Sequence, residues 1–274
     1  GSGGNSQGYR NDFLEYDPVA DTWTQIVSFP GGVRDAAVGF SIGSKGYVGT
    51  GASLTAPGTN DFYEYDPMAN SWTQKANIPG KRSFAFGLSI GTKGYIGTGQ
   101  DSTGSNQMDD FWEYDTATNT WTQKANFPGG LTMDIDGEHF VIGNYGYVGK
   151  GNNFWKYDQT NNIWTLITNL PAVGRIGAIG FSINNKGYIG LGYVNSSTIL
   201  NDLWEYSFDS TGIGVNEVAN SATIFNAYPN PTSSAVTLQY ELPKGEKEGE
   251  IILYTTQGAE VKRYKVDDTF KDLL

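Results

Sequence analysis

A unit of about 50 residues recurs along most of this 274-residue chain, and it constrains the fold more than any other feature. Its clearest part ends on a tryptophan, as in NDFYEYDPMANSWTQ at 60–74 and DDFWEYDTATNTWTQ at 109–123. The recurring tryptophans are Trp23, Trp72, Trp121 and Trp164, which lie 49, 49 and 43 residues apart. A second motif recurs between them, as in KGYVGTG at 45–51. Because two motifs recur in a fixed order, the chain is expected to repeat one supersecondary unit.

Each unit predicts four short β-strands. The first is apolar with small residues, as in AAVGFSI at 36–42, and the second is the Gly-Tyr-aliphatic-Gly motif. The third reads Phe/Leu-aromatic-Glu-Tyr-Asp with few exceptions, and the fourth carries the tryptophan. Large rings bury about 150–250 Å² each, so the four tryptophans are expected to be structural anchors that wedge between neighbouring sheets.

The pattern Gly-Tyr-aliphatic-Gly-x-Gly followed by Asp-x-Trp-Glu-Tyr-Asp and Asn-x-Trp resembles kelch repeats over residues 1–208. The resemblance implies an all-β fold, a kelch-type β-propeller whose blades have four strands each. The expected strands do not fill a whole number of blades. We therefore expect about five blades, incomplete at the N-terminus, with strands missing before Gly1.

Composition excludes several classes of function. The net charge of −11 leaves no basic face for nucleic acid, and the absence of cysteine excludes disulfides, thiolate metal sites and cysteine nucleophiles. It also excludes the cysteine-linked copper cofactor of kelch-like oxidases. No apolar run approaches the roughly 20 residues that a membrane span needs.

The C-terminal part lacks the repeat. Residues 209–222 are small and polar and predict a linker, and 223–274 show alternating strands that predict a small Ig-like β-sandwich. Its Tyr228-Pro229-Asn230-Pro231 motif, with the later strand pattern, resembles the C-terminal (Por) sorting domain of the type IX secretion system of Bacteroidetes. The usual final strands are missing, so we expect this domain to be truncated. The resemblance implies contact with the secretion machinery and an extracellular or outer-membrane location in a bacterium. An unrelated Ig-like domain is the alternative.

No catalytic residue, metal site or cofactor is expected. The single histidine, His139, lies near Asp134, Asp136 and Glu138, which would suit a divalent ion, but an acidic loop leading into a strand explains the pattern better. Paired carboxylates of the glycosidase type stay open. The acids recur once per unit, however, as Glu64, Glu113 and Glu205 do, which favours a scaffold role.

The candidate binding residues are three arginines, Arg34, Arg82 and Arg175, in the loops that join one unit to the next. These loops and the loops between strands two and three should emerge at one end of the sheets. Arginine binds carboxylates in a bidentate manner, so a partial cationic ring there would bind an acidic ligand. Pairing of the same arginines with acids of neighbouring blades is the equal alternative.

These observations predict a secreted or cell-surface binding module rather than an enzyme. Its partner would be an unknown protein or an acidic glycan. The alternative is an extracellular glycan-active enzyme or lectin that uses the same loop face.

Overall fold

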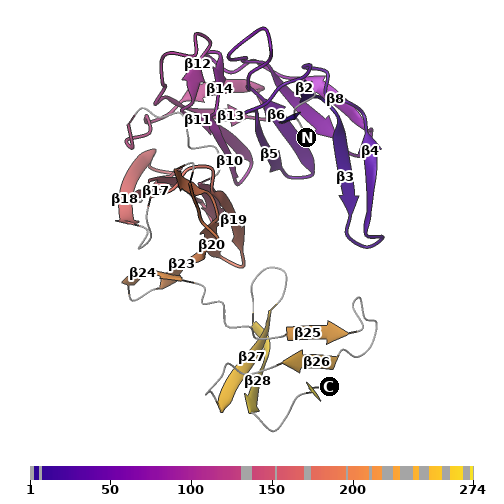
Figure 1. The fold of residues 1–274 in the computed structure, drawn as a ribbon, viewed down its shortest axis with the longest axis vertical. Helices are drawn as coiled ribbons and strands as arrows, with labels where there is room; N and C mark the ends of the chain where they lie inside the picture. The colour runs from indigo at the N-terminus through magenta and orange to yellow at the C-terminus, as the bar shows by residue number, and fades with distance from the viewer. Residues whose placement is uncertain are drawn as a thin grey trace. The chain divides into compact units, whose positions relative to one another are not determined.

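The structure is a computed structural model, and it divides the chain into two compact units, Gly1–Asn216 and Glu217–Leu274. It describes residues 3–5, 8–130, 138–151, 153–169, 174–195, 197–209, 212–217, 225–228, 237–240, 247–254, 260–267 and 272–273. Each unit is treated separately below. All the regular elements of the described residues are β-strands (Figure 1).

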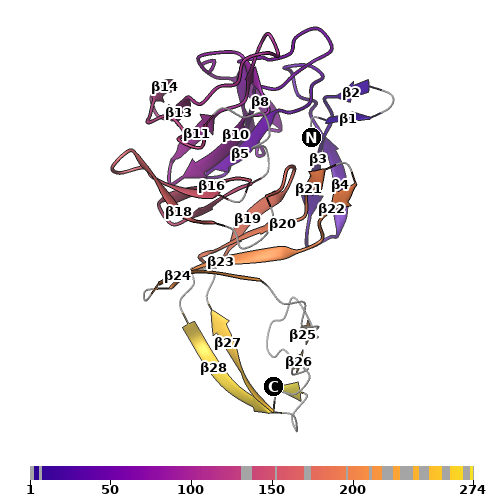
Figure 2. The same ribbon diagram turned by 60° about the vertical axis from the view of Figure 1, so that its left-hand side comes forward.

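The first unit is built from antiparallel sheets that follow one another along the chain (Figures 1 and 2). We number the five sheets of the repeated units sheets 1 to 5; the described part of this unit also contains three short two-stranded sheets, one of them formed by β1 (Gly3–Asn5) and β2 (Gly8–Arg10). Sheet 1 has two strands, β3 (Phe13–Asp17) and β4 (Thr22–Ile26). The other four sheets have four strands each, in chain order. They are sheet 2, with β5 (Val38–Ile42), β6 (Lys45–Gly49), β7 (Phe62–Asp66) and β8 (Ser71–Gln74); sheet 3, with β10 (Phe86–Ile90), β11 (Lys93–Gly97), β13 (Phe111–Asp115) and β14 (Thr120–Gln123); sheet 4, with β15 (His139–Ile142), β16 (Tyr145–Lys150), β17 (Asn153–Asp158) and β18 (Ile163–Asn169); and sheet 5, with β19 (Ile179–Ile183), β20 (Lys186–Gly190), β23 (Leu203–Asp209) and β24 (Gly212–Glu217).

Strand β24 corrects the expected domain boundaries. The sequence predicted only three strands for the last repeated unit, at 177–208, and a linker at 209–222. Instead, Asp209 closes β23, and Gly212–Glu217 forms the fourth strand of the sheet. The segment forms a strand without the tryptophan motif, because strand pairing needs only backbone groups. The first unit therefore extends to Asn216, beyond the expected limit of 208.

The sheets pack face to face through their first strands. Strand β10 lies against β5, β15 against β10, and β19 against β15. Glycine in the second strand permits this approach, as at Gly187, where an added Cβ would lie 2.0 Å from Cε2 of Phe140. Gly94 faces the ring of Phe40 in the same way, with Cε2 only 2.6 Å from the Cβ position. The glycines of the repeated motif thus allow neighbouring sheets to crowd together, as expected.

Aromatic rings fill the space between sheets. Phe62 of sheet 2 lies 5.0 Å from Trp121 of sheet 3, and Phe111 of sheet 3 lies 5.1 Å from Trp164 of sheet 4, both edge to face. Trp72 meets Phe13 and Phe29 in the same manner. Three of the four expected anchors therefore pack between sheets. Trp23 differs, because 66% of its surface is exposed.

The second unit contains two small sheets. One has β25 (Phe225–Tyr228), β26 (Thr237–Tyr240) and β29 (Asp272–Leu273), and the other pairs β27 (Glu248–Tyr254) with β28 (Glu260–Asp267). Tyr228 ends β25. Pro229, Asn230 and Pro231 of the expected sorting motif lie outside the described residues.

Candidate ligand-binding face

One end of the sheets carries both sets of long loops, as the sequence predicted. The loop that enters sheet 3 and the loop between its second and third strands pair as β9 (Arg82–Ser83) and β12 (Gln100–Asp101). Isolated bridges repeat the arrangement, joining Asp35 to Ala52 in sheet 2 and Ile176 to Tyr193 in sheet 5. We call this end the loop face.

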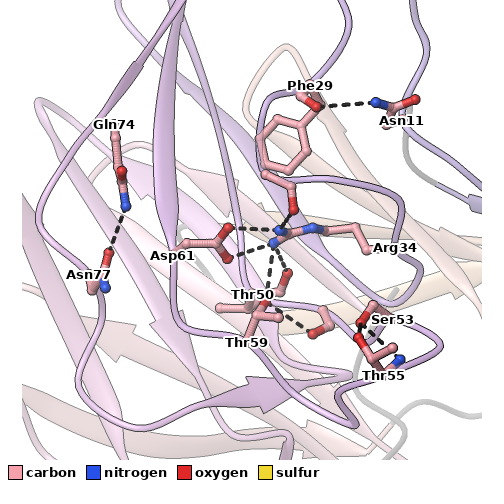
Figure 3. A network of polar contacts seen from close by, with 12 residues as sticks. Asn11, Phe29, Arg34, Thr50, Ser53, Thr55, Thr59, Asp61, Gln74 and Asn77 are labelled. Atoms are coloured by element: carbon pink, nitrogen blue, oxygen red, sulfur yellow. Dashed lines mark hydrogen bonds and ion pairs between the residues drawn. The ribbon is translucent and has the colours of Figure 1, made fainter.

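The three arginines expected on this face lie inside it. Arg34, Arg82 and Arg175 are exposed by only 2%, 0% and 2%. Each guanidinium forms a bidentate pair with the aspartate that precedes the third strand of its own sheet. In sheet 2, Arg34 Nη1 and Nη2 each donate to Asp61 over 2.7 Å (Figure 3). Arg82 pairs with Asp110 over 2.7 and 2.8 Å, and Arg175 pairs with Asp202 over 2.6 and 2.8 Å.

The same guanidinium groups also bind backbone carbonyls at the start of the loop that follows the second strand. Arg34 donates to the carbonyl of Thr50, Arg82 to that of Thr98 and Arg175 to that of Leu191. Each arginine thus joins the beginning of that loop to the aspartate at its end. The Arg175 guanidinium holds the pKa of Asp202 below its usual value, and a hydrogen bond from Trp204 acts in the same direction.

This geometry corrects the expectation of a cationic ring. A ligand carboxylate would need the two terminal nitrogens of the guanidinium, and the aspartate already occupies both. The acids also belong to the same sheet as the arginine, whereas the sequence-based alternative placed them on a neighbouring blade. The arginines are therefore structural parts of the loop face.

Sheet 4 departs from this pattern. Asn153 stands where the other sheets have the paired aspartate, and Lys156 stands where they have glutamate. Lys150, at the position of Thr50 and Thr98, donates to the carbonyl of Gly129. The indole nitrogen of Trp155 is buried without a hydrogen bond, whereas the equivalent nitrogen of Trp112 bonds to Asp110 over 2.6 Å. Sheet 4 has therefore replaced the arginine network with a different set of contacts.

An open cleft lies on the loop face at sheet 5. It has a volume of about 450 Å³ and is lined by Gly192, Tyr193, Asn195 and Ile199. These residues belong to the hairpin of β21 (Tyr193–Asn195) and β22 (Thr198–Ile199), in which Tyr193 pairs directly with Ile199. Paired residues of an antiparallel hairpin present their side chains on one side, so the ring and the aliphatic chain face the same space.

The cleft combines apolar surface with hydrogen-bonding groups. Tyr193 is 43% exposed and Ile199 is 83% exposed. The amide oxygen of Asn195 accepts a hydrogen bond from the Ser197 N–H, and no described residue binds its amide nitrogen. The sequence had placed this loop on the correct face but had not singled out these residues. The available signal was the pair of apolar dipeptides, Tyr193-Val194 and Ile199-Leu200, at the two ends of this loop.

None of the described residues that line the cleft carries a carboxylate, an imidazole or an amine. His139 is half-buried beside the ring of Phe86, with the two ring centroids 6.2 Å apart, and desolvation lowers its pKa to about 4. Asp134 and Asp136 lie outside the described residues. Within the part of the chain that the structure describes, no cluster of acidic and histidine side chains could hold a metal ion.

Comparison with known proteins bears on the fold of the first unit. No family model and no curated protein matches the chain. A solved structure titled "Structure of YjhT" is similar, with a TM-score of 0.57 over 78% of this chain and 93% of that chain. Successive four-stranded sheets that pack through their first strands agree with this match.

The first unit is a β-propeller. At 16% identity, the similarity shows the fold of the propeller and nothing about its ligand. No helix among the described residues is long and apolar enough to cross a membrane.

Proposed function

We propose that this chain is a binding module, a kelch-type propeller that takes its ligand in the cleft formed by Tyr193, Asn195 and Ile199. The observation that carries this proposal is the composition of the cleft, an exposed ring and aliphatic chain beside an amide. Pockets that bind small ligands are mostly apolar with a few placed polar groups, and this cleft follows that rule. The described lining offers no carboxylate or histidine for acid–base chemistry, which favours binding over catalysis.

The second candidate is a lectin or glycan-active enzyme, which the same cleft also supports. An exposed tyrosine ring beside an asparagine amide matches the two faces of a sugar, because the ring contacts C–H groups and the amide bonds to hydroxyls. The buried arginine–aspartate pairs argue against an acidic ligand at their positions, so a neutral glycan fits better than the acidic glycan first expected.

The test is a glycan and peptide array probed with the full chain, followed by a turnover assay on each ligand bound. A binding module should retain the ligand unchanged, and Tyr193→Ala should weaken binding by about tenfold or more. Leu54→Ala is the matched control, because Leu54 is 78% exposed on another loop of the same face. Product release would support the enzyme instead. Equal binding by wild type and Tyr193→Ala would contradict the cleft.

We further propose that residues 223–274 are a type IX sorting domain and that the protein acts outside the cell or on the outer-membrane surface. The support is the Tyr228-Pro229-Asn230-Pro231 motif and its position at the start of a separate compact unit.

A further inference from the structure

The cleft at sheet 5 is built on a backbone junction that recurs in sheets 2 and 3. In each of these sheets, a glycine with a positive φ lies two residues after the second strand and against the loop that enters the sheet. At Gly192, an added Cβ would lie 2.7 Å from the carbonyl oxygen of Ile176 and 3.1 Å from the nitrogen of Ala178. Gly51 and Gly99 make the same approach in sheets 2 and 3. The residue between the two contacted ones is therefore equivalent in the three sheets, and it is Ala36, Phe84 or Gly177.

The backbone of this junction does not require glycine at position 177. Gly177 has a φ of 63°, in the left-handed region that glycine favours. The equivalent residues nevertheless carry side chains, since Ala36 has a φ of 48° and Phe84 has a φ of 55°. The junction thus accepts alanine and phenylalanine, and the glycine of sheet 5 must serve another purpose.

The ring of Tyr193 supplies that purpose. A Cβ at Gly177 would lie 3.2 Å from Cε1 of the ring and 3.8 Å from Cδ1. The first distance is shorter than the usual contact between carbon atoms, so the ring would have to move. The backbone of Tyr193 is held in place, because its N–H and C=O bond to Ile176 over 3.0 and 2.9 Å. The ring would therefore have to turn about its own side-chain bonds.

The large side chain changes place between sheets 3 and 5. In sheet 3 the ring belongs to the entering loop, as Phe84, and Gln100 stands at the position of Tyr193. In sheet 5 the entering loop has Gly177, and the ring belongs to the facing loop. Sheet 2 has alanine at both positions. Within these three sheets, a ring at one position therefore occurs only with a residue that leaves it room at the other.

The loop strands of sheet 5 also carry an apolar row that their arrangement does not demand. Tyr193 pairs with Ile176 on one side and with Ile199 on the other, so three apolar residues lie in register across the strands. The same pairings in sheet 3 give a polar row, which consists of Ser83, Gln100 and Gln107. An equal arrangement of strands thus forms with polar residues, and the apolar row is specific to the sheet that holds the cleft.

We propose that Gly177 is a positioning residue of the cleft: it leaves room for the edge of the Tyr193 ring and so orients the ring for the flat face of a neutral sugar. The inference rests on the proposed binding function of the cleft. The apolar face of a pyranose ring would lie on Tyr193 and Ile199, and a sugar oxygen would accept a hydrogen bond from the Asn195 amide. A side chain at position 177 would turn the tyrosine ring and misplace that face.

The first test needs no ligand and uses NMR of the full chain labelled with ¹³C. Tyr193→Phe assigns the Tyr193 ring signal among those of the 17 tyrosines. In the wild type, a nuclear Overhauser effect should join the Gly177 α-protons to the ring ε-protons, because Cε1 lies 3.2 Å from the Cβ position. Gly177→Ala should shift the ring signal. Ala36→Gly, a change of the same size at the equivalent position of sheet 2, should leave it in place. An unmoved ring signal in Gly177→Ala overturns the proposal.

The second test applies the same variants to the glycan and peptide array, after thermal unfolding has confirmed that each is folded at the array temperature. Gly177→Ala should weaken binding to the neutral glycans retained by the wild type by about threefold, which is half, on a free-energy scale, of the roughly tenfold loss expected for Tyr193→Ala. Ala36→Gly should bind as the wild type does.

The outcomes separate this inference from the proposed function. Undiminished binding by Gly177→Ala despite a displaced ring overturns the role of Gly177 in recognition, and retention of peptides alone overturns the sugar. If the array retains no ligand, or if Tyr193→Ala binds as the wild type does, the proposed function of the cleft fails instead. The ring signal in the ligand-free protein still decides whether Gly177 positions Tyr193.

Discussion

Arg82 illustrates how one buried side chain organises the loop face. Its guanidinium joins Asp110 to the carbonyls of Thr98 and Pro79, and none of its surface is exposed. A guanidinium has five N–H groups in one plane, so it can bind a carboxylate and two carbonyls at once, which an ammonium group could not do in the same geometry. The residue therefore acts on the backbone of two loops at once.

We expect Arg82→Ala to destabilise the protein by about 3–5 kcal/mol, because it leaves Asp110 without its buried partner. Arg82→Lys should recover only part of this loss, since one ammonium cannot bond to both carboxylate oxygens and both carbonyls. Urea unfolding followed by tryptophan fluorescence measures these differences.

The matched control for Arg82 is its neighbour Lys81, which is exposed. Lys81→Ala should change the stability by no more than about 0.5 kcal/mol. The double variant Arg82→Met with Asp110→Leu should be less destabilised than Arg82→Ala, because no unpaired charge remains. An Arg82→Ala protein as stable as Lys81→Ala would contradict the structural role.

The sequence could locate these arginines but not their partners. Arg82 and Asp110 are 28 residues apart, and an aspartate occurs at the same place in four of the five units. The sequence alone therefore does not distinguish pairing within a sheet from pairing between sheets. Only the register of the first and third strands decides between them.

At the scale of elements, an asparagine and a tryptophan of sheets 2, 3 and 4 bind the backbone that follows the preceding sheet, so each of these sheets depends on the one before it. Trp121 is half-buried, contacts Phe62 of sheet 2 and bonds to Ala76 of the same sheet. We expect Trp121→Ala to lower the free energy of unfolding by about 3 kcal/mol, because it removes a packed ring and leaves the Ala76 carbonyl without its hydrogen-bond donor. Thermal unfolding compared with wild type measures the loss.

Trp23→Ala is the control for Trp121, because it removes the equivalent side chain from sheet 1, where the ring contacts Tyr16 of its own sheet. We expect a loss below about 1 kcal/mol, in line with the 66% exposure of Trp23. Similar losses in the two variants would mean that the ring itself, rather than its place between two sheets, provides the stability.

The repeat predicted most strands of the large sheets, but it predicted neither strand β24 nor the cleft, for physical reasons. Strand β24 pairs through its backbone and needs no tryptophan, so no motif marks it. The cleft depends on the register of Tyr193 with Ile199, which is set by a short turn and an irregular pairing. Neither motif nor composition specifies that register. Strand order and the glycine contacts, by contrast, follow directly from the recurring motifs.

At the scale of the whole molecule, the proposed binding and export functions belong to different units. The proposed binding residues lie within Gly1–Asn216 and the proposed sorting motif lies within Glu217–Leu274. This separation predicts that each activity can be lost without the other. Tyr193→Ala should alter ligand binding and leave export unchanged.

We expect a reporter joined to the natural protein from residue 223 onward to reach the surface of a type IX-competent cell. Replacing Tyr228, Pro229, Asn230 and Pro231 with alanine should retain the reporter in the periplasm. Surface labelling and protease accessibility measure the outcome, and a strain without the secretion machinery provides the control. Export of the alanine variant at the wild-type level would contradict the sorting assignment.

The arginine–aspartate pairs have a further consequence for how much the loops of this face can vary. Each guanidinium fixes both ends of one loop, at Thr50 and Asp61 in sheet 2, and at Leu191 and Asp202 in sheet 5. The residues between those ends can therefore vary in length and sequence while their attachment points stay constant. Sheet 4, where the described residues contain no such pair, has kept only a short connection between Lys150 and Asn153. A different insert between the same two attachment points would therefore change the proposed binding surface without changing the sheet that carries it.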